Sequence, residues 1–271
     1  MTQFKKFYDL SQPVYDHCPG WPTYEPTVVR YEATYEKDRF NAEQIRLNSH
    51  TGTHLDAPFH FFPDGKTIDQ LDVSLFQGNA VIVDLRGIIQ AKQGIDASHL
   101  EPYADKIHEG SIVLFDTGWN EKRSFDKEYT NDWPYLTGEG AEWLKVKGIK
   151  GVGIDTLSMG GWYEGTGRPC HEALLSGGIW ILEEISIPDE LAKLGSCYLM
   201  AFPIKLKGFS GGPANDHQRH VAAQGGSRHV LSLQGHFGIA HGPVGPVALI
   251  GHVPGPAAPG LILGGQNAVH L

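Results

Sequence analysis

The 271-residue sequence has few cysteines, few basic residues and no long apolar segment. Its three cysteines, Cys18, Cys170 and Cys197, are too few for a disulfide framework, so we expect core thiols in a reducing compartment. Lys and Arg number 22 against 31 acidic residues, which gives a formal net charge of −9. Nucleic-acid binding depends on basic side chains that contact phosphates, and we therefore expect no nucleic-acid partner.

No segment is apolar over the roughly 18 residues that a membrane span requires, and the N-terminus has no signal-like apolar run. We expect no membrane partner and a cytoplasmic location. A chain of this length, 41% hydrophobic, can bury a sizeable core. These properties favour a globular protein that acts on a small molecule.

Short apolar segments alternate with helical patterns from residue 80 onward. Buried strands are predicted at residues 80–85, 111–116, 149–154 and 178–182, and an amphipathic helix is predicted at 137–147, ending at Gly148. Residues 7–35 mix aromatic, Pro and charged positions, which indicates short strands and loops. The whole pattern predicts an α/β fold.

The composition changes near Pro213. Residues 213–271 contain one acidic residue, two Arg, no Lys and seven of the fourteen His, with repeated Gly-Pro segments that interrupt regular structure. We therefore expect a main domain at 1–212 and a loop-like or poorly ordered tail at 213–271.

The segment His50–His60 concentrates the groups that bind metals or transfer protons. These are His50, His54, Asp56 and His60, all at even positions, so an extended chain places them on one face. A straight strand would hold His50 and His54 about 13 Å apart, too far for one ion. The chain must therefore curl, and Gly52 and Pro58 supply the unusual backbone angles and the fixed exit.

Two imidazoles and one carboxylate form a mixed nitrogen and oxygen set that suits Zn, Mn or Fe and leaves positions open for water. Such a site activates water for hydrolysis at neutral pH. His60, with an unperturbed pKa of about 6.5, is expected to move the proton.

The pattern His-x-Gly-Thr-His-x-Asp-x-Pro-x-His resembles the signature of the cyclase family of metal-dependent hydrolases, which includes bacterial kynurenine formamidase and isatin hydrolase. The resemblance extends over residues 7–212 and includes Gly-Ile-Asp-Thr-Leu-Ser at 153–158 and Ile-Leu-Glu at 181–183. After Gly212 the sequence departs from the family pattern.

The resemblance implies several expectations about fold and site. The fold would be a single α/β domain of the swivelling β/β/α type with a mixed sheet, in a homodimer or larger assembly. His50, His54 and Asp56 would be ligands and His60 the acid/base. Asp56, His171 and Glu183 would hold a second ion in formamidase-like members, with Glu184 as the alternative carboxylate. One or two ions, Mn or Zn, are expected.

The expected activity is hydrolysis of a C–N amide bond in a small aromatic formamide or cyclic amide. Trp21, Phe59 and Phe62 are the candidates for the substrate walls.

Two other functions compete with this interpretation. A metal could merely stabilise a non-catalytic small-ligand binding domain. Alternatively, Gly208-Phe-Ser-Gly-Gly212 matches the elbow of serine hydrolases with Ser210 as nucleophile, although that elbow requires a helix after the serine. A cysteine nucleophile at Cys170, beside His171, is a weaker candidate.

Overall fold

Four parallel strands form the centre of the main sheet, as the apolar segments of the sequence predict. In the computed structural model, which describes residues 6–220, these strands are β5 (Gln77–Asp84), β7 (Ile112–Asp116), β9 (Gly151–Ile154) and β10 (Trp180–Glu183). Each overlaps one of the predicted strand segments. The mixed α/β domain with a large mixed sheet is therefore confirmed.

Four antiparallel strands complete this sheet: β1 (Lys6–Asp9), β4 (His54–Asp56), β11 (Ser196–Pro203) and β12 (Gly211–His220). The strand order is β1-β12-β11-β5-β7-β9-β10-β4. The beginning of β12 also pairs with β4, the last strand of the order, so the sheet closes on itself between β12 and β4. This closure brings β4, which contains His54 and Asp56 of the predicted metal-binding motif, beside a strand more than 150 positions later in the sequence.

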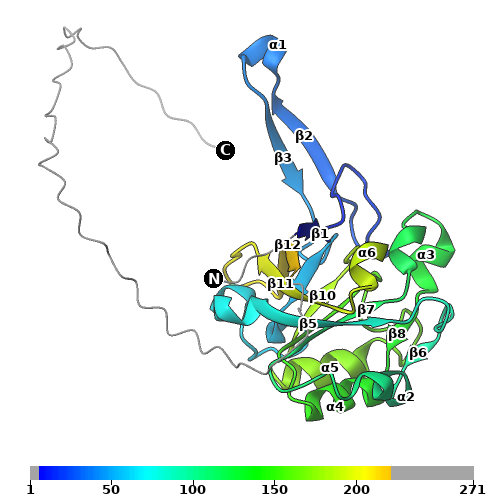
Figure 1. The fold of residues 1–271 in the computed structure, drawn as a ribbon. Coiled ribbons are helices and arrows are strands. Elements are labelled where there is room, and N and C mark those ends of the chain that lie inside the picture. The colour runs from blue at the N-terminus through cyan, green and yellow to red at the C-terminus, as the bar shows by residue number, and fades with distance from the viewer. Residues whose placement is uncertain (1–5, 221–271) are drawn as a thin grey trace, which may run out of the picture. The chain divides into compact units, whose positions relative to one another are not determined.

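Helices α4 (Gly138–Val146) and α5 (Arg168–Ser176) lie side by side on one face of the sheet (Figure 1). The predicted helix at 137–147 is confirmed: the Thr137 side chain accepts a hydrogen bond from the Gly140 amide at the N-terminus, and Gly148 follows the helix with a φ of 71°. The remaining short elements are α1 (Tyr35–Asp38), α2 (Ala97–Leu100), α3 (Lys127–Asn131), α6 (Asp189–Ala192), β2 (Val28–Ala33), β3 (Ala42–Arg46), β6 (Gly94–Ile95) and β8 (Tyr135–Leu136).

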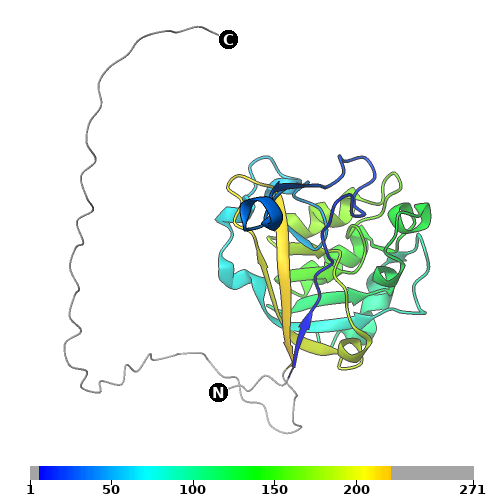
Figure 2. The same ribbon diagram turned by 90° about the horizontal axis from the view of Figure 1, so that it is seen from above.

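Alternation along the strands divides the core into two clusters. Val81 and Val83 of β5 belong to the cluster beneath α4 and α5, whereas Ala80 and Ile82 belong to the cluster enclosed by the closed sheet. Seen from above, β1 (blue) lies beside β12 (yellow-orange) (Figure 2). The face of the sheet toward the helices is the one that receives the candidate site.

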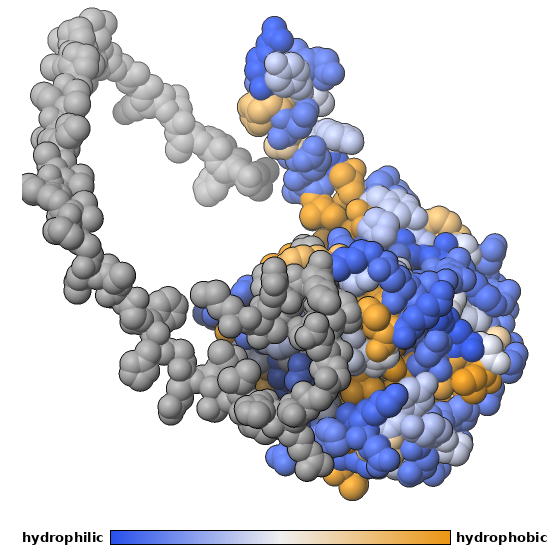
Figure 3. Space-filling model, in the orientation of Figure 1, coloured by the Kyte–Doolittle hydropathy of each residue, from blue (hydrophilic) through white to orange (hydrophobic). Residues whose placement is uncertain are grey.

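Strands β2 and β3 form a separate hairpin that projects from the rest of the domain (Figure 1). Most of its side chains are exposed, including Tyr31 at 72% and Ile45 at 48%. The cross-strand pairs place Val29, Tyr31 and Ile45 on one face, while Gln44 lies on the other. Apolar residues are visible on this hairpin in Figure 3.

The sequence predicts loop structure from residue 213 onward, and for 213–220 this prediction is wrong. These residues continue β12, which pairs with β11, β4 and β1. Neighbouring strands, rather than an apolar pattern in the segment itself, specify this strand. Residues 221–271 lie outside the described residues.

The three cysteines are free and buried, as expected. Within residues 6–220, none of the helices has the length and apolar character needed to cross a membrane.

Candidate metal centre

The motif curls as its sequence requires. Gly52 has a φ of 65°, in the left-handed region that favours glycine, and the strand β4 covers only His54–Asp56. Pro58 then begins a 3-10 turn that ends at His60. The predicted curl and the role of Gly52 are confirmed.

The register between β4 and β10 places three of the predicted ligands on one face. Glu183 lies opposite His54, and Ile181 lies opposite Asp56. Leu55 and Leu182 point into the enclosed cluster, so their neighbours along each strand point toward α5. His171 lies on α5, on the same side.

All four of these ligand candidates are buried, and their donor atoms converge. Nε2 of His54 lies 3.2 Å from Oε2 of Glu183 and 3.5 Å from Oδ1 of Asp56. Nε2 of His171 lies 3.2 Å from Oε1 of Glu183 and 3.7 Å from Oδ2 of Asp56. Sequence separation alone could not establish this convergence.

Two of these buried atoms have no hydrogen-bond partner among the described residues, namely Nε2 of His54 and Oδ2 of Asp56. Leaving a buried polar atom without a partner is costly, and a cation between the two would satisfy both. The residues present therefore fit a divalent metal ion.

The charges of the four ligand candidates, His54, Asp56, His171 and Glu183, also favour a cation. Burial disfavours both the carboxylates and the imidazolium ions, but the attraction between them prevails. It holds the pKa of Asp56 well below its usual range and that of Glu183 at about 2. Asp56 and Glu183 raise the pKa of His54, whereas Cys170 and Glu183 raise that of His171. Two buried carboxylates thus remain ionised and attract positive charge.

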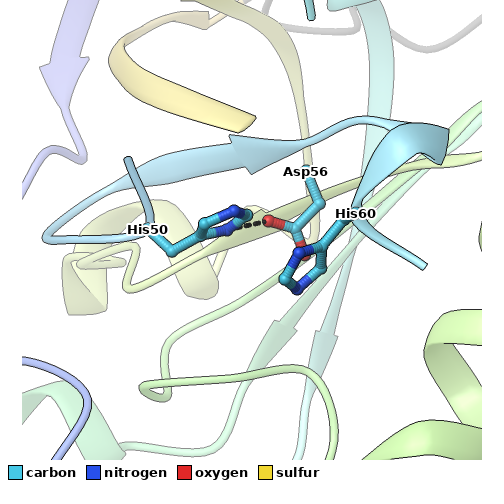
Figure 4. A group of neighbouring side chains, drawn as sticks. All are labelled: His50, Asp56 and His60. Carbon is cyan, nitrogen blue, oxygen red and sulfur yellow. Dashed lines mark hydrogen bonds and ion pairs between the residues drawn. The ribbon is translucent and has the colours of Figure 1, made fainter. Parts of the chain in front are cut away.

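His60 lies against His50. Their rings stack with centroids 4.1 Å apart, and Nδ1 of His50 lies 2.7 Å from Oδ1 of Asp56 (Figure 4). Burial lowers the pKa of His60 to about 4, so that its imidazole is neutral at pH 7. Donor atoms lie within 4.8 Å of one another in two sets: His50, Asp56 and His60, and His54, Asp56 and Glu183.

Glu183, not Glu184, faces the cluster. The Ser158 hydroxyl (3.1 Å) and the Met159 amide (2.6 Å) both donate to Oε1 of Glu183 and fix this carboxylate. Glu184 follows the strand with a φ of 54°, and its buried carboxylate lies 3.5 Å from Arg123. Because β10 ends at Glu183, the carboxylates of Glu183 and Glu184 have different partners.

A cavity of about 340 Å³ opens onto His50, His60, His171 and Glu183. Its remaining lining residues are mainly aromatic or small: Trp21, Tyr24, Phe61, Leu157, Ser158, Gly161, Trp162, Tyr163, Gly167 and Arg168. The volume is in the range of small-molecule sites.

Of the three predicted wall residues, only Trp21 lines this cavity. Phe59 is 37% exposed, and Phe62 packs against the cluster beneath the helices. The 3-10 turn after Pro58 breaks the strand alternation, and it places Phe61 in the wall instead. The aromatic pair Trp162–Tyr163 was the sequence signal for the opposite wall, and it was missed.

The alternative nucleophiles have different surroundings. Ser210 lies immediately before β12, and a strand rather than a helix follows it, so the elbow of serine hydrolases is absent at this position. Its hydroxyl nevertheless lies 2.8 Å from Nε2 of His50. Cys170 is fully buried in the cluster beneath the helices and does not line the cavity.

Comparison with known proteins identifies the family. The family model described as "Putative cyclase" matches residues 8–160. The chain belongs to the cyclase family. A kynurenine formamidase from Bacillus cereus is 31% identical over 212 residues, which cover 77% of this chain and 94% of the relative.

Solved structures of this family have the same fold. A potential metal-dependent hydrolase with cyclase activity matches with a TM-score of 0.66 and 28% identity, over 79% of this chain and 97% of that one. Isatin hydrolase A from Labrenzia aggregata matches with a TM-score of 0.71 and 22% identity, over 80% and 94%. At 22% identity, the second match supports the fold alone.

Proposed function

We propose that this member of the cyclase family is a metal-dependent hydrolase that cleaves the C–N bond of a small aryl formamide or cyclic amide. The observation that carries the proposal is the buried donor set, in which His54 Nε2 and Asp56 Oδ2 have no hydrogen-bond partner among the described residues, beside an aromatic cavity. The kynurenine formamidase relatives support hydrolysis of a non-peptide C–N bond.

His50, His54 and Asp56 would hold a first metal ion, and Asp56, His171 and Glu183 a second. The donors are nitrogen and oxygen without thiolate, which favours Mn or Zn. A divalent ion bound there lowers the pKa of water and polarises a carbonyl. The Ser158 hydroxyl and the Met159 amide keep the Glu183 carboxylate in place.

His60 would act as the acid/base. It lines the cavity and stacks on His50, so its ring can reach a group bound beside the ligands. A neutral imidazole accepts a proton as water attacks and returns it to the leaving nitrogen. The role assigned here requires that His60 is not a ligand, although its donor atom lies near those of His50 and Asp56.

The cavity walls favour a flat aromatic substrate. Trp21 and Trp162 contact each other with ring centroids 5.1 Å apart, and Phe61 stacks on His171 at 4.8 Å. Such rings hold an aryl group by offset or edge contacts and exclude water around it. We place aryl formamides before cyclic amides because the formamidase relatives exceed 30% identity over three quarters of the chain.

We further propose that the protein is a homodimer and that the second copy covers the apolar face of the β2–β3 hairpin. A two-stranded hairpin is marginally stable in water on its own. On one face of it, beside Glu43, lies an apolar stripe in which Tyr31 and Ile45 are exposed and Val29 is half-buried. Pairing with another copy would bury that stripe.

Metal analysis combined with a hydrolysis panel tests the main proposal. Purified protein is assayed on aryl formamides, isatin and cyclic imides, before and after EDTA and with Mn or Zn restored. We expect aryl formamide turnover that EDTA abolishes and metal restores. Turnover that survives complete metal removal would favour a serine or cysteine nucleophile, and metal binding without any turnover would favour the non-catalytic alternative.

His60→Ala provides a second test of the same site. The variant should keep its metal content while turnover falls by about 100-fold or more. Loss of metal from this variant would show that His60 is a ligand.

A further inference from the structure

Two of the candidate metal-binding imidazoles, those of His54 and His171, are held by backbone carbonyl groups that contact their Nδ1 atoms. Nδ1 of His54 lies 2.7 Å from the Gly52 oxygen, and Nδ1 of His171 lies 2.8 Å from the Gly167 oxygen. A carbonyl oxygen only accepts, so each Nδ1 carries the proton and donates it. The Nε2 of each ring therefore points toward the carboxylates, as metal-binding histidines require.

His50 is fixed by a side chain instead. Its Nδ1 faces Oδ1 of Asp56 at 2.7 Å, and its Nε2 faces the hydroxyl of Ser210 at 2.8 Å. The orientation is the reverse of the other two rings, because here Nδ1 points toward the carboxylates. Ser210 thus occupies the position that the backbone carbonyls of Gly52 and Gly167 occupy for the other rings.

The closed sheet holds Ser210 firmly in this position. The Ala57 amide donates to the Ser210 carbonyl oxygen at 2.8 Å, and Gly211 pairs with Asp56 across β12 and β4. A Cβ at Gly211 would lie 2.7 Å from Cε1 of His50, so only glycine lets the strand pass this close to the ring. The serine backbone is therefore locked beside the motif, 160 positions from His50.

We propose that Ser210 is a positioning residue that orients His50 for metal binding. This inference rests on the proposed metal centre. A hydroxyl can donate or accept. The Ser210 hydroxyl donates to Nε2 of His50 while the ring proton is on Nδ1, toward Asp56. When a cation faces the lone pair of Nδ1, the ring proton is on Nε2 and the hydroxyl accepts it. Neither side chain has to move between the ion-free and the ion-bound form.

The same contacts also trace a serine–histidine–aspartate chain, from the Ser210 hydroxyl through His50 to Asp56. A nucleophile must reach the substrate, but Ser210 is not among the residues that line the aromatic cavity. Asp56 also contacts His54 at 3.5 Å, and its second oxygen lies 3.7 Å from Nε2 of His171. The carboxylate is thus shared within a metal-binding cluster, which favours positioning over nucleophilic attack.

Metal affinity distinguishes these roles. Four ion-free proteins are titrated with Zn²⁺ against a chromophoric chelator: the wild type, Ser210→Ala, Ser210→Thr and Ser176→Ala. The last is the control, because Ser176 is an exposed serine at the end of α5. We expect Ser210→Ala to bind the first ion about 10- to 100-fold more weakly. Ser210→Thr, which retains the hydroxyl, and Ser176→Ala should bind as the wild type does. Thermal melts of the ion-free proteins verify that the variants fold.

Turnover at saturating metal gives the second readout. Under the proposal, Ser210→Ala regains most of its activity once the metal is saturating. Wild-type metal affinity in Ser210→Ala would overturn the proposal, and abolished turnover in that variant at full occupancy would establish a nucleophile. Because affinity is measured without substrate, a wild type that binds metal but hydrolyses no amide would refute the proposed function and leave this test intact.

Discussion

At the scale of single residues, neighbouring acids at the end of β10 have opposite roles. The Glu183 carboxylate faces His54 and His171, whereas that of Glu184 faces Arg123. Burial raises the pKa of Glu184 to about 7, in contrast to the lowered pKa of Glu183. Adjacent positions in the chain therefore hold a carboxylate that stays ionised and one that burial drives toward the neutral form.

Substituting each acid tests this division. Glu183→Gln should lose bound metal, because an amide is a weaker ligand and cannot balance the charge of the ion. Glu184→Gln should retain wild-type metal content, since glutamine resembles its protonated form. Elemental analysis of the two variants at equal protein concentration measures the difference. The reverse result would move the ligand assignment by one position.

Asp116 is a residue whose charge opposes folding. Burial and the repulsion from Asp155 raise its pKa to about 7, although Arg86 lies 3.2 Å away. A carboxyl group whose pKa is higher in the folded state contributes stability at low pH and loses it as the pH rises from about 4 to about 7. Asp116 therefore destabilises the folded protein at pH 8.

We predict that Asp116→Asn increases the free energy of unfolding at pH 8, on the order of 1–2 kcal/mol. The gain should vanish near pH 4, where the wild-type carboxyl is already neutral. Urea unfolding of both proteins at the two pH values measures it. An equal difference at both pH values would show that packing, not charge, is responsible.

At the scale of elements, the β2–β3 hairpin is the part of the domain with the least support from its surroundings. Its apolar stripe faces outward, and β2 and β3 pair only with each other among the described strands. If a second copy covers the stripe, the assembly should depend on one face of the hairpin and not on the other.

Two adjacent positions of β3 provide the test. Ile45→Lys places a charge in the apolar stripe and should convert the dimer to a monomer. Gln44→Lys places the same charge on the opposite face and should leave the dimer intact. Light scattering after size-exclusion chromatography measures the mass. A dimer in both variants, or a monomeric wild type, would contradict the proposed interface.

The motif segment shows where sequence reasoning about an element succeeded. The even positions, the need for a curl at Gly52 and the break at Pro58 are local properties, and the structure has all three. The same alternation failed one turn later, because in the 3-10 turn at Pro58–His60 side chains no longer alternate. For that reason Phe61, rather than Phe59 or Phe62, lines the cavity.

At the scale of the whole molecule, β12 closes the sheet. Its first residues pair with β4, and its remainder lies between β11 and β1. Strand closure covers edges that would otherwise expose unpaired backbone groups. The closure also places the Ser210 hydroxyl 2.8 Å from Nε2 of His50.

Truncation separates the contribution of this strand from that of the tail. A chain that ends at Gly212 lacks most of β12 and should lose stability on the order of the whole net value, about 5–15 kcal/mol. A chain that ends at His220 retains every strand that pairs in the described sheet and should melt cooperatively and bind metal. Circular dichroism melts compare both with the full chain. Wild-type melting of the shorter chain would show that β12 is dispensable.

The sequence by itself determined the chemistry of the centre and the local shape of the segment that carries most of it. Ligand types, their spacing and the glycine and proline between them lie within eleven residues, so short-range geometry was sufficient. The tertiary structure decided which distant groups join them. Packing between segments far apart in the chain brings His171, Glu183, Ser210 and the cavity walls to the motif, and the local spacing of residues does not specify these contacts.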